Sequence, residues 1–497
     1  MGQIKEQTIK GSVFSYFGVL LGFAISGLLL PKLFTTGENG LIKLLIAYSS
    51  MFAQFATLGF TYATGRLFSY FRDEKTNHHG FFGLTMLVMV AGFIVSIISF
   101  YFLKDFILND SKDGSELLSE YLIFLVPLIF FTLLYLMLDS YFKMLFQTVI
   151  GTFVKEFLLR ILILASILLF YLEVINFREF IIAYIIANSL PGLILLVAVL
   201  ISGKVNWKPD FTFIKPDLAR SLSSMSFYGI MIGFSGIMIL NIDSIMISKM
   251  VGIEATGIYA ITYFFGTLII IPSRSLRKIA GTVLAEAWRK NDLETVASVY
   301  RKSSINQLII GILIFIGLWG NIHNVFEILP AVYKAGMWVI FFVALTNLIE
   351  MTSGVSEIMI QTSKNYRYGA FLFAVFLLLV LVFNFIFIKS MGLVGAAVAN
   401  TVSYIIYNIM RYVYIYRNYG MQPFSFKHVY AVLAGIFVYG ISLLVPVFGH
   451  YIPDIAVRST LMVVVYGFIV YKLNLSEDIN QSADQLIRRL TGDRKRK

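Results

Sequence analysis

Residues 370–388 read AFLFAVFLLLVLVFNFIFI, a run in which Asn384 is the only polar residue. As a helix rising 1.5 Å per residue it would be about 28 Å long, close to the roughly 30 Å of a bilayer's hydrocarbon core. Lipid offers no partners to backbone N–H and C=O groups, so a spanning segment must be a helix or part of a closed barrel. A barrel strand would alternate apolar and polar residues, and this run does not. The stretch predicts a transmembrane helix.

Similar apolar runs recur along the chain, which is 58% hydrophobic and 14% charged, with a mean hydropathy of +0.81. A soluble chain of this length would carry far more polar surface. We therefore predict an all-α multi-pass membrane protein with about 14 transmembrane helices. The expected spans are 12–33, 41–64, 81–103, 120–142, 153–175, 180–202, 226–247, 256–279, 303–320, 336–360, 370–388, 393–416, 428–449 and 458–473.

The distribution of positive charge sets the expected orientation. Lys and Arg gather in alternate loops and at both ends, including Lys5, Arg66, the segment 203–225 and the tail that ends at Arg494-Lys495-Arg496-Lys497, while the intervening loops are sparse in them. By the positive-inside rule, both termini are expected in the cytosol. Topology thus explains the formal charge of +12 without nucleic acid. The chain has no cysteine, and its five histidines are scattered apart from His78-His79, so we expect no metal site.

Two echoes indicate an internal repeat. Lys32 and Gly40 in LLLPKLFTTGENGLI align without a gap with Lys249 and Gly257 in IMISKMVGIEATGIY, and Ala187-Asn188-Ser189 echoes Ala399-Asn400-Thr401 at nearly the same offset. Six spans per copy would give parallel repeats, which commonly hold substrate between them. We predict two pseudo-symmetric six-helix bundles plus two extra C-terminal helices. The expected divisions are an N-terminal lobe at 1–202, a cytosolic linker at 203–225, a C-terminal lobe at 226–416, two added helices at 417–473 and a basic cytosolic tail at 474–497.

Charged side chains inside spans are the candidates for function, because each costs roughly 2.5–3.5 kcal/mol at the bilayer centre on insertion scales. Arg160 either pairs with Glu156 one turn earlier or faces a cavity. Arg274 and Arg277 follow Pro272, which should kink the eighth span, and they either snorkel to the cytosolic surface or line a cavity. Arg66 ends a polar face of the second span, where it is either a topological charge or a phosphate contact.

Span ten carries the clearest polar face, which includes Asn347, Glu350 and Glu357 at helical spacing. A carboxylate as deep as Glu350 is either a candidate for Na⁺ or H⁺ coupling or a structural hydrogen-bonding group. Asp243, beside Asn241 in span seven, could ligate a cation, pair with Lys249 or simply lie at the interface. The chain has no phosphate-binding glycine loop, no HExxH motif and no acidic cluster in an external loop, so we expect no enzyme.

Three stretches carry a family resemblance: NIDSIMISKMVGIEATGIYAITYFFG at 241–266, AEAWRKNDLETVASVYRKS at 285–303 and MGLVGAAVANTVSY at 391–404. With them the chain resembles, over essentially its full length, the polysaccharide transporter branch of the multidrug, oligosaccharidyl-lipid and polysaccharide exporter superfamily, notably the Wzx-type O-antigen flippases. Drug exporters of that superfamily usually carry a carboxylate in the first span, and lipid II flippases an arginine; this first span has neither. A lipid II-type flippase ranks second, ahead of a multidrug exporter.

The resemblance implies a flippase that moves a polyprenyl-diphosphate-linked oligosaccharide, such as an O-antigen or capsular repeat unit, from the inner to the outer leaflet of a bacterial inner membrane. Its diphosphate would contact cations, for which we expect Arg66, Arg160, Arg274 and Arg277. Implied partners are the lipid-linked oligosaccharide, membrane lipids and polysaccharide-assembly membrane proteins. A membrane-embedded glycan polymerase or ligase is the alternative from another class, and it would need an external catalytic loop.

Overall fold

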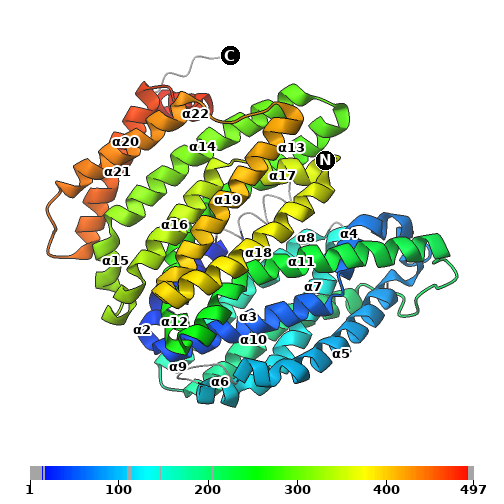
Figure 1. The fold of residues 1–497 in the computed structure, drawn as a ribbon. Coiled ribbons are helices and arrows are strands. Elements are labelled where there is room, and N and C mark those ends of the chain that lie inside the picture. Colours follow the sequence, from blue (N-terminus) through cyan, green and yellow to red (C-terminus); the bar gives the residue numbers. More distant parts are fainter. Residues whose placement is uncertain (1–13, 15–16, 109–114, 146, 204, 491–497) are drawn as a thin grey trace. The chain divides into compact units, whose positions relative to one another are not determined.

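The computed structural model describes residues 14, 17–108, 115–145, 147–203 and 205–490, and within these ranges the chain forms helices and no strand. It divides into two compact units, residues 1–261 (unit 1) and 262–497 (unit 2), which are considered separately (Figure 1). The prediction of an all-α multi-pass fold is confirmed.

Unit 1 is built from helices that run from the blue to the green part of the chain in Figure 1. The central helix α3 packs against α5, α7 and α11, and α10 packs against α7 and α9. The helices are η1 (Phe23–Leu29), α2 (Leu30–Leu33), α3 (Thr36–Ala56), α4 (Phe60–Phe71), η2 (His78–Gly80), α5 (Phe81–Leu108), α6 (Ser115–Tyr121), η3 (Leu122–Phe124), α7 (Leu125–Met144), α8 (Thr148–Thr152), η4 (Phe153–Leu158), α9 (Leu159–Tyr171), α10 (Phe177–Ile201), α11 (Pro216–Met250) and the first part of α12 (Ile253–Thr267).

The second predicted span is broken rather than continuous. Between α3 and α4 the chain bends by 42°. Leu58 and Gly59 have positive φ there, and the Thr57 hydroxyl accepts a hydrogen bond from the Gly59 N–H at 3.2 Å. A Cβ on Gly59 would lie 2.8 Å from the carbonyl carbon of Gly229 on α11, so glycine serves both the backbone conformation and the close helix approach.

Unit 2 contains the end of α12 and the helices that follow it. α16 packs between α14 and α19, α18 packs on α19, and α20 and α21 pack on each other and on α14. A core of Leu308, Ile312, Val438 and Tyr466 joins these last three helices. The helices are η5 (Leu268–Ile270), α13 (Ile271–Lys290), α14 (Leu293–Gly320), α15 (Ile322–Ile328), η6 (Ala331–Gly336), α16 (Met337–Thr352), α17 (Ser356–Thr362), α18 (Tyr366–Met391), α19 (Leu393–Tyr419), α20 (Phe426–Leu443), α21 (Tyr451–Lys472) and α22 (Glu477–Leu490).

Judged by helix length and apolar composition, the structure gives fewer membrane crossings than the fourteen expected. Among the described residues, eleven helices are long and apolar enough to cross a membrane, or twelve when α3 and α4 count as one span. The first predicted span corresponds to a shorter apolar helix, Phe17–Leu33, and residues 12, 13, 15 and 16 of that span lie outside the described residues. The fifth, 153–175, corresponds to η4 and α9, of which η4 is π-helical. The count of fourteen stays a prediction.

The aligned glycines of the repeat meet in unit 1. A Cβ on Gly40 would lie 3.0 Å from the carbonyl carbon of Ile253, and a Cβ on Gly257 would lie 2.8 Å from that of Thr36. Each glycine therefore faces the carbonyl group four residues before the other glycine. This reciprocal contact is what two related segments make across a two-fold axis, and it supports the predicted repeat.

The segment after α10 packs against earlier parts of unit 1. The Gly83 N–H donates to the Asn206 carbonyl at 3.1 Å, and the Asp210 N–H donates to the His79 carbonyl at 3.2 Å. The His79 ring stacks on Phe213 with 3.7 Å between ring centroids. α11 begins at Pro216, so the predicted linker 203–225 includes its first turns. The predicted domain boundaries stay a prediction.

Candidate functional site

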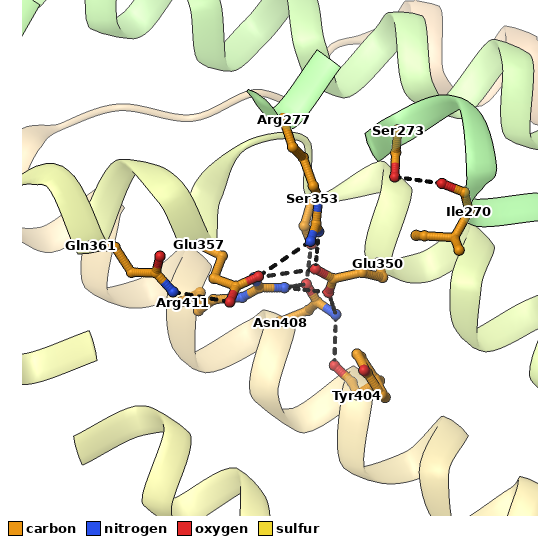
Figure 2. Close-up of polar contacts among 10 residues, drawn as sticks. All are labelled: Ile270, Ser273, Arg277, Glu350, Ser353, Glu357, Gln361, Tyr404, Asn408 and Arg411. Atoms are coloured by element: carbon orange, nitrogen blue, oxygen red, sulfur yellow. Dashed lines mark hydrogen bonds and ion pairs between the residues drawn. The ribbon is translucent and has the colours of Figure 1, made fainter. Parts of the chain in front are cut away.

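Four helices of unit 2 bring charged side chains to one place (Figure 2). Arg277 comes from α13, Glu350 from α16, Glu357 from α17 and Arg411 from α19. α16 ends at Thr352 and a turn with Gly354 at positive φ precedes α17, so the two carboxylates approach the same point from different helices. These four residues are called the Arg277 cluster below.

Arg277 bridges the two carboxylates. Its Nη2 donates to Glu350 Oε1, and its Nη1 donates to Glu357 Oε2 at 3.3 Å. About a quarter of each of the Arg277 and Glu357 side chains is exposed. Arg277 is therefore the cation of the cluster that a ligand could reach.

Arg411 holds Glu350 from the other side. Its Nη2 donates to Glu350 Oε2 at 2.5 Å, and its Nη1 lies 3.8 Å from Glu357 Oε2. The guanidinium lies over the Tyr407 ring at 4.4 Å from the centroid. Only 1% of the Arg411 side chain is exposed, so this arginine is enclosed.

Neutral side chains complete the cluster. Asn408 Nδ2 donates to Glu350 Oε2 at 3.2 Å, its Oδ1 accepts from Arg411 and Ser353, and Gln361 Nε2 donates to Glu357 Oε1 at 3.0 Å. Two guanidinium and two carboxylate groups balance in charge, which is what a low-dielectric site requires. The Nε atoms of Arg277 and Arg411 are buried and have no hydrogen-bond partner within the described part of the chain.

Arg411 and Asn408 are the members that sequence reasoning missed. They lie in the second half of the predicted span 393–416, and an arginine near the end of that span is also expected from positive-inside bias. The spacing Asn400, Tyr404, Asn408 and Arg411 places one polar stripe on α19, and that stripe could have indicated them.

Two other predicted residues of unit 2, Asn347 and Arg274, are not members of the Arg277 cluster. Asn347 Nδ2 donates to the Gly266 carbonyl at 3.1 Å and to the Val343 carbonyl at 2.9 Å, which ties α16 to α12 within the unit. Arg274 is exposed on α13, three residues before Arg277. The kink expected at Pro272 stays a prediction: the short 3₁₀ segment η5 ends at Ile270, and Pro272 lies in the first turn of α13.

In unit 1, Arg160 makes the predicted ion pair, with Nη2 at 3.0 Å from Glu156 Oε2. Its Nη1 donates to the Gly18 carbonyl of the first helix. Arg66 is exposed on α4, with its guanidinium 5.5 Å from the centroid of the Tyr62 ring. Unit 1 thus holds these two predicted cations at separate places.

Asn241 and Asp243 lie in a buried polar group near the end of α11. Lys43 Nζ on α3 donates to Asn241 Oδ1 at 3.2 Å, and the Tyr259 hydroxyl donates to Asp243 Oδ2 at 2.8 Å. Asp243 is 4% exposed and Tyr259 is 2% exposed. Within the described residues, no group of three or more His, Cys, Asp or Glu side chains is placed to hold a metal ion.

Comparisons with solved structures identify the fold. The chain is similar to lipid II flippase MurJ in an inward closed conformation, with a TM-score of 0.75 and 14% identity over 94% of this chain and 98% of that one. It is also similar to an inward-facing multidrug resistance MATE family transporter (0.61, 13% identity, 82% and 94% covered) and to the Vibrio cholerae MATE transporter VcmN (0.56, 12% identity, 85% and 100% covered). At this identity the likeness concerns the fold.

Sequence comparisons then give the family. Comparison with curated proteins gives no match. The family model described as polysaccharide biosynthesis protein matches residues 16–284, more than half of the 497 residues. The chain therefore belongs to the polysaccharide biosynthesis protein family and has the fold of the flippases and exporters of the MOP superfamily.

Proposed function

We propose that the chain is a flippase that moves a polyprenyl-diphosphate-linked oligosaccharide from the inner to the outer leaflet by alternating access. The observation that carries the proposal is the Arg277 cluster: a partly exposed arginine shared between two carboxylates in a polysaccharide biosynthesis protein with a flippase fold. A diphosphate needs a cation that can leave its carboxylate partner, and arginine offers a planar fork that matches phosphate oxygens.

In this proposal the substrate exchanges places with Glu357. Arg277 Nη1 and Glu357 Oε2 are 3.3 Å apart, and both side chains are partly exposed. Glu350, whose side chain is 8% exposed, stays paired with Arg411. The diphosphate then replaces one carboxylate on Arg277 while the buried pair keeps its charge balance. When the headgroup leaves, Glu357 returns and restores the resting cluster.

The other predicted cations have smaller parts. Arg274 and Arg66 are exposed and would attract the anionic headgroup before it binds. Arg160 is held by Glu156 and by the Gly18 carbonyl, so we assign it to holding the first helix of unit 1. For coupling to Na⁺ or H⁺ we propose Glu350 or Asp243. Transfer that continues after the Na⁺ and H⁺ gradients are both collapsed would show that the flippase is passive.

The setting follows from the predicted topology. We propose a bacterial inner membrane with both termini in the cytosol, an O-antigen or capsular repeat unit as cargo, and polysaccharide-assembly membrane proteins as partners. α22 would lie at the cytosolic surface. No enzymatic step is part of this proposal.

The experiment is a leaflet-accessibility assay. The full chain is reconstituted in vesicles with a defined polyprenyl-diphosphate oligosaccharide, and the glycolipid exposed outside is measured over time. The proposal expects unchanged glycolipid to move faster than in empty vesicles. A longer glycan would identify a polymerase instead, and movement no faster than in empty vesicles would refute a flippase.

A lipid II-type flippase is the second candidate, and the likeness to MurJ over 94% of the chain favours it. The same vesicles separate the two. Faster transfer of lipid II than of an oligosaccharide-linked lipid would replace the first proposal with this one.

A further inference from the structure

Unit 2 contains a polar pocket of about 750 Å³ that shares no lining residue with the Arg277 cluster. The first half of α14 and the first turns of α20 and α22 form its walls, and α20 and α22 both pack on α14 (Figure 1). The volume lies within the range of ligand-binding sites. Three cationic and three acidic side chains line the pocket: Arg301, Lys302, Lys427, Glu294, Glu477 and Asp478. Such a lining favours a ligand that carries both signs of charge over one with a large net charge.

Some of these charges already have partners within the protein. Lys302 Nζ lies 3.5 Å from Asp478 Oδ1, and Asn306 Nδ2 donates to Asp478 Oδ2 at 2.8 Å, so these side chains hold α22 on α14. Lys427 Nζ donates to the Asn474 carbonyl at 2.9 Å. An ammonium has three donors, so Lys427 keeps two N–H groups for a ligand.

Three charged side chains of the lining are exposed and make no hydrogen bond or ion pair with any described residue: Arg301, Glu294 and Glu477. Glu294 precedes Arg301 by seven residues on α14, which is two turns and about 10.5 Å, so the two side chains lie on one face. Arg301 is the nearer of the two to the apolar stretch of α14 that crosses the membrane. Together with Lys427, the pocket thus offers a ligand two cations and two carboxylates.

The pocket lies where the lipid-facing surface of α20 begins. Lys427 and His428 line it from the first turn of α20, a helix that is long and apolar enough to cross a membrane. Directly beyond that turn, α20 exposes Val429, Val432 and Ile436. An exposed apolar face on a spanning helix contacts hydrocarbon. The charged groups of the pocket therefore lie at the depth of the lipid headgroups, next to the acyl chains.

We propose that this pocket binds the headgroup of a phospholipid with a phosphate and a primary ammonium, phosphatidylethanolamine, whose acyl chains lie along α20. Arg301 and Lys427 bind the phosphate, for which arginine and lysine are the usual donors. Glu294 and Glu477 accept hydrogen bonds from the ammonium. Phosphatidylglycerol has no ammonium for these carboxylates, and the choline of phosphatidylcholine has no N–H to donate. The inference goes beyond the proposed function and does not depend on it.

The test measures lipid binding to the purified full chain in detergent by native mass spectrometry. Phosphatidylethanolamine is expected to bind at least about fivefold more tightly than phosphatidylglycerol or phosphatidylcholine with the same acyl chains. An equal concentration of soluble glycerophosphoethanolamine should not displace it, because that molecule has no acyl chains to bury on α20. Equal binding of the three lipids would overturn the proposal. Displacement by glycerophosphoethanolamine or by inorganic phosphate at that concentration would identify a soluble occupant and overturn it as well.

Variants of Arg301 test the phosphate contact. Arg301→Gln should weaken the binding of phosphatidylethanolamine about tenfold. Arg417→Gln is the matched control, because Arg417 is an exposed arginine of α19 that does not line the pocket, and it should leave the binding unchanged. Unchanged binding in Arg301→Gln, or equal losses in the two variants, would contradict the proposal.

The double variant Glu294→Gln with Glu477→Gln tests the ammonium contact. It should remove the preference for phosphatidylethanolamine over phosphatidylglycerol, whereas Arg301→Gln should weaken the binding of both lipids. Arg301, Glu294 and Glu477 make no ion pair with a described residue, so each variant should fold, and thermal unfolding without lipid checks this. A preference for phosphatidylethanolamine that survives in the folded double variant would refute the proposed role of the two carboxylates.

Discussion

Unit 2 contains two buried groups of charged side chains, the Arg277 cluster and a second group on α21 in which Asp454 pairs with Arg458 (the Asp454 cluster). In the Asp454 cluster, Arg458 Nη2 is 3.1 Å from Asp454 Oδ1, and Arg458 Nη1 donates to the Ser442 carbonyl at 2.5 Å. Asp454 Oδ2 also binds Asn324 Nδ2 and His323 Nε2, at 2.5 and 2.7 Å. This group ties α21 to α15 and to the end of α20.

The two groups differ in what they leave accessible. Asp454 is fully buried and Arg458 is 3% exposed, and Arg458 donates to the backbone carbonyls of Ser442 in the last turn of α20 and of Val445 just after it. In the Arg277 cluster the partners are side chains, and Arg277 and Glu357 reach the surface. The ion pair of the Asp454 cluster is therefore a fixed contact that holds helices together, which we call a clamp. The ion pair between Arg277 and Glu357 is a contact that can be exchanged.

The largest effect is expected for Glu350→Gln. It removes the carboxylate that faces two arginines and leaves buried charge unbalanced, so unfolding should become easier by about 3–5 kcal/mol. Thermal unfolding in detergent and the yield of monodisperse protein measure this. The double variant Glu350→Leu with Arg411→Met removes one carboxylate and one guanidinium together, so it should regain stability. Stability close to that of the unmodified protein in Glu350→Gln would mean that the cluster is not ionised as described.

A smaller loss is expected for Asp454→Asn. Arg458 keeps its two backbone acceptors, so the cost should be about 2 kcal/mol. Because this group is a clamp, the folded fraction should transfer glycolipid at the normal rate. If the transfer rate falls by more than the folded fraction falls, the Asp454 cluster takes part in transport. The difference drawn between the Asp454 cluster and the Arg277 cluster would then not hold.

Glu357→Gln separates exchange from simple structure. Both partners of the Arg277–Glu357 contact are partly exposed, so stability should change by less than about 1 kcal/mol. The substrate no longer displaces a charged carboxylate, so half-saturation should occur at about fivefold lower glycolipid concentration. Glu286→Gln, which breaks the exposed pair with Lys290, is the control. Weaker substrate binding in Glu357→Gln would speak against exchange.

The smallest effect concerns the segment after α10. The pKa of Asp210 is lowered, mainly by the hydrogen bond from the Thr212 hydroxyl. A carboxyl whose pKa is lowered in the folded protein stabilises the docked segment at pH values above its ordinary pKa. That contribution is lost as the pH falls through the pKa of the folded protein. Asp210→Asn should therefore slightly speed chymotryptic cleavage after Phe211 and Phe213 at neutral pH and remove the acid dependence of that cleavage. An unchanged pH profile in the variant would show that Asp210 does not hold the segment.

Sequence reasoning reached most of the fold and three of the four residues of the Arg277 cluster, all but Arg411. Apolar runs locate helices because lipid leaves the backbone no other choice, and the polar face of span ten indicated Glu350 and Glu357. The break at Leu58–Gly59 could not be predicted, since it depends on the close approach of α11. Arg411 was missed because its partner lies 61 residues away, and the face of α19 that meets α16 is decided by packing.

The most direct test of the exchange proposed at Arg277 is the leaflet-transfer rate of Arg277→Lys beside Arg274→Ala. Lysine keeps the charge but cannot bridge two carboxylates or grip a diphosphate with a planar fork. The account predicts that Arg277→Lys folds normally and transfers glycolipid at least about tenfold more slowly, while Arg274→Ala retains most of the rate. Full transfer by a well-folded Arg277→Lys protein would contradict it.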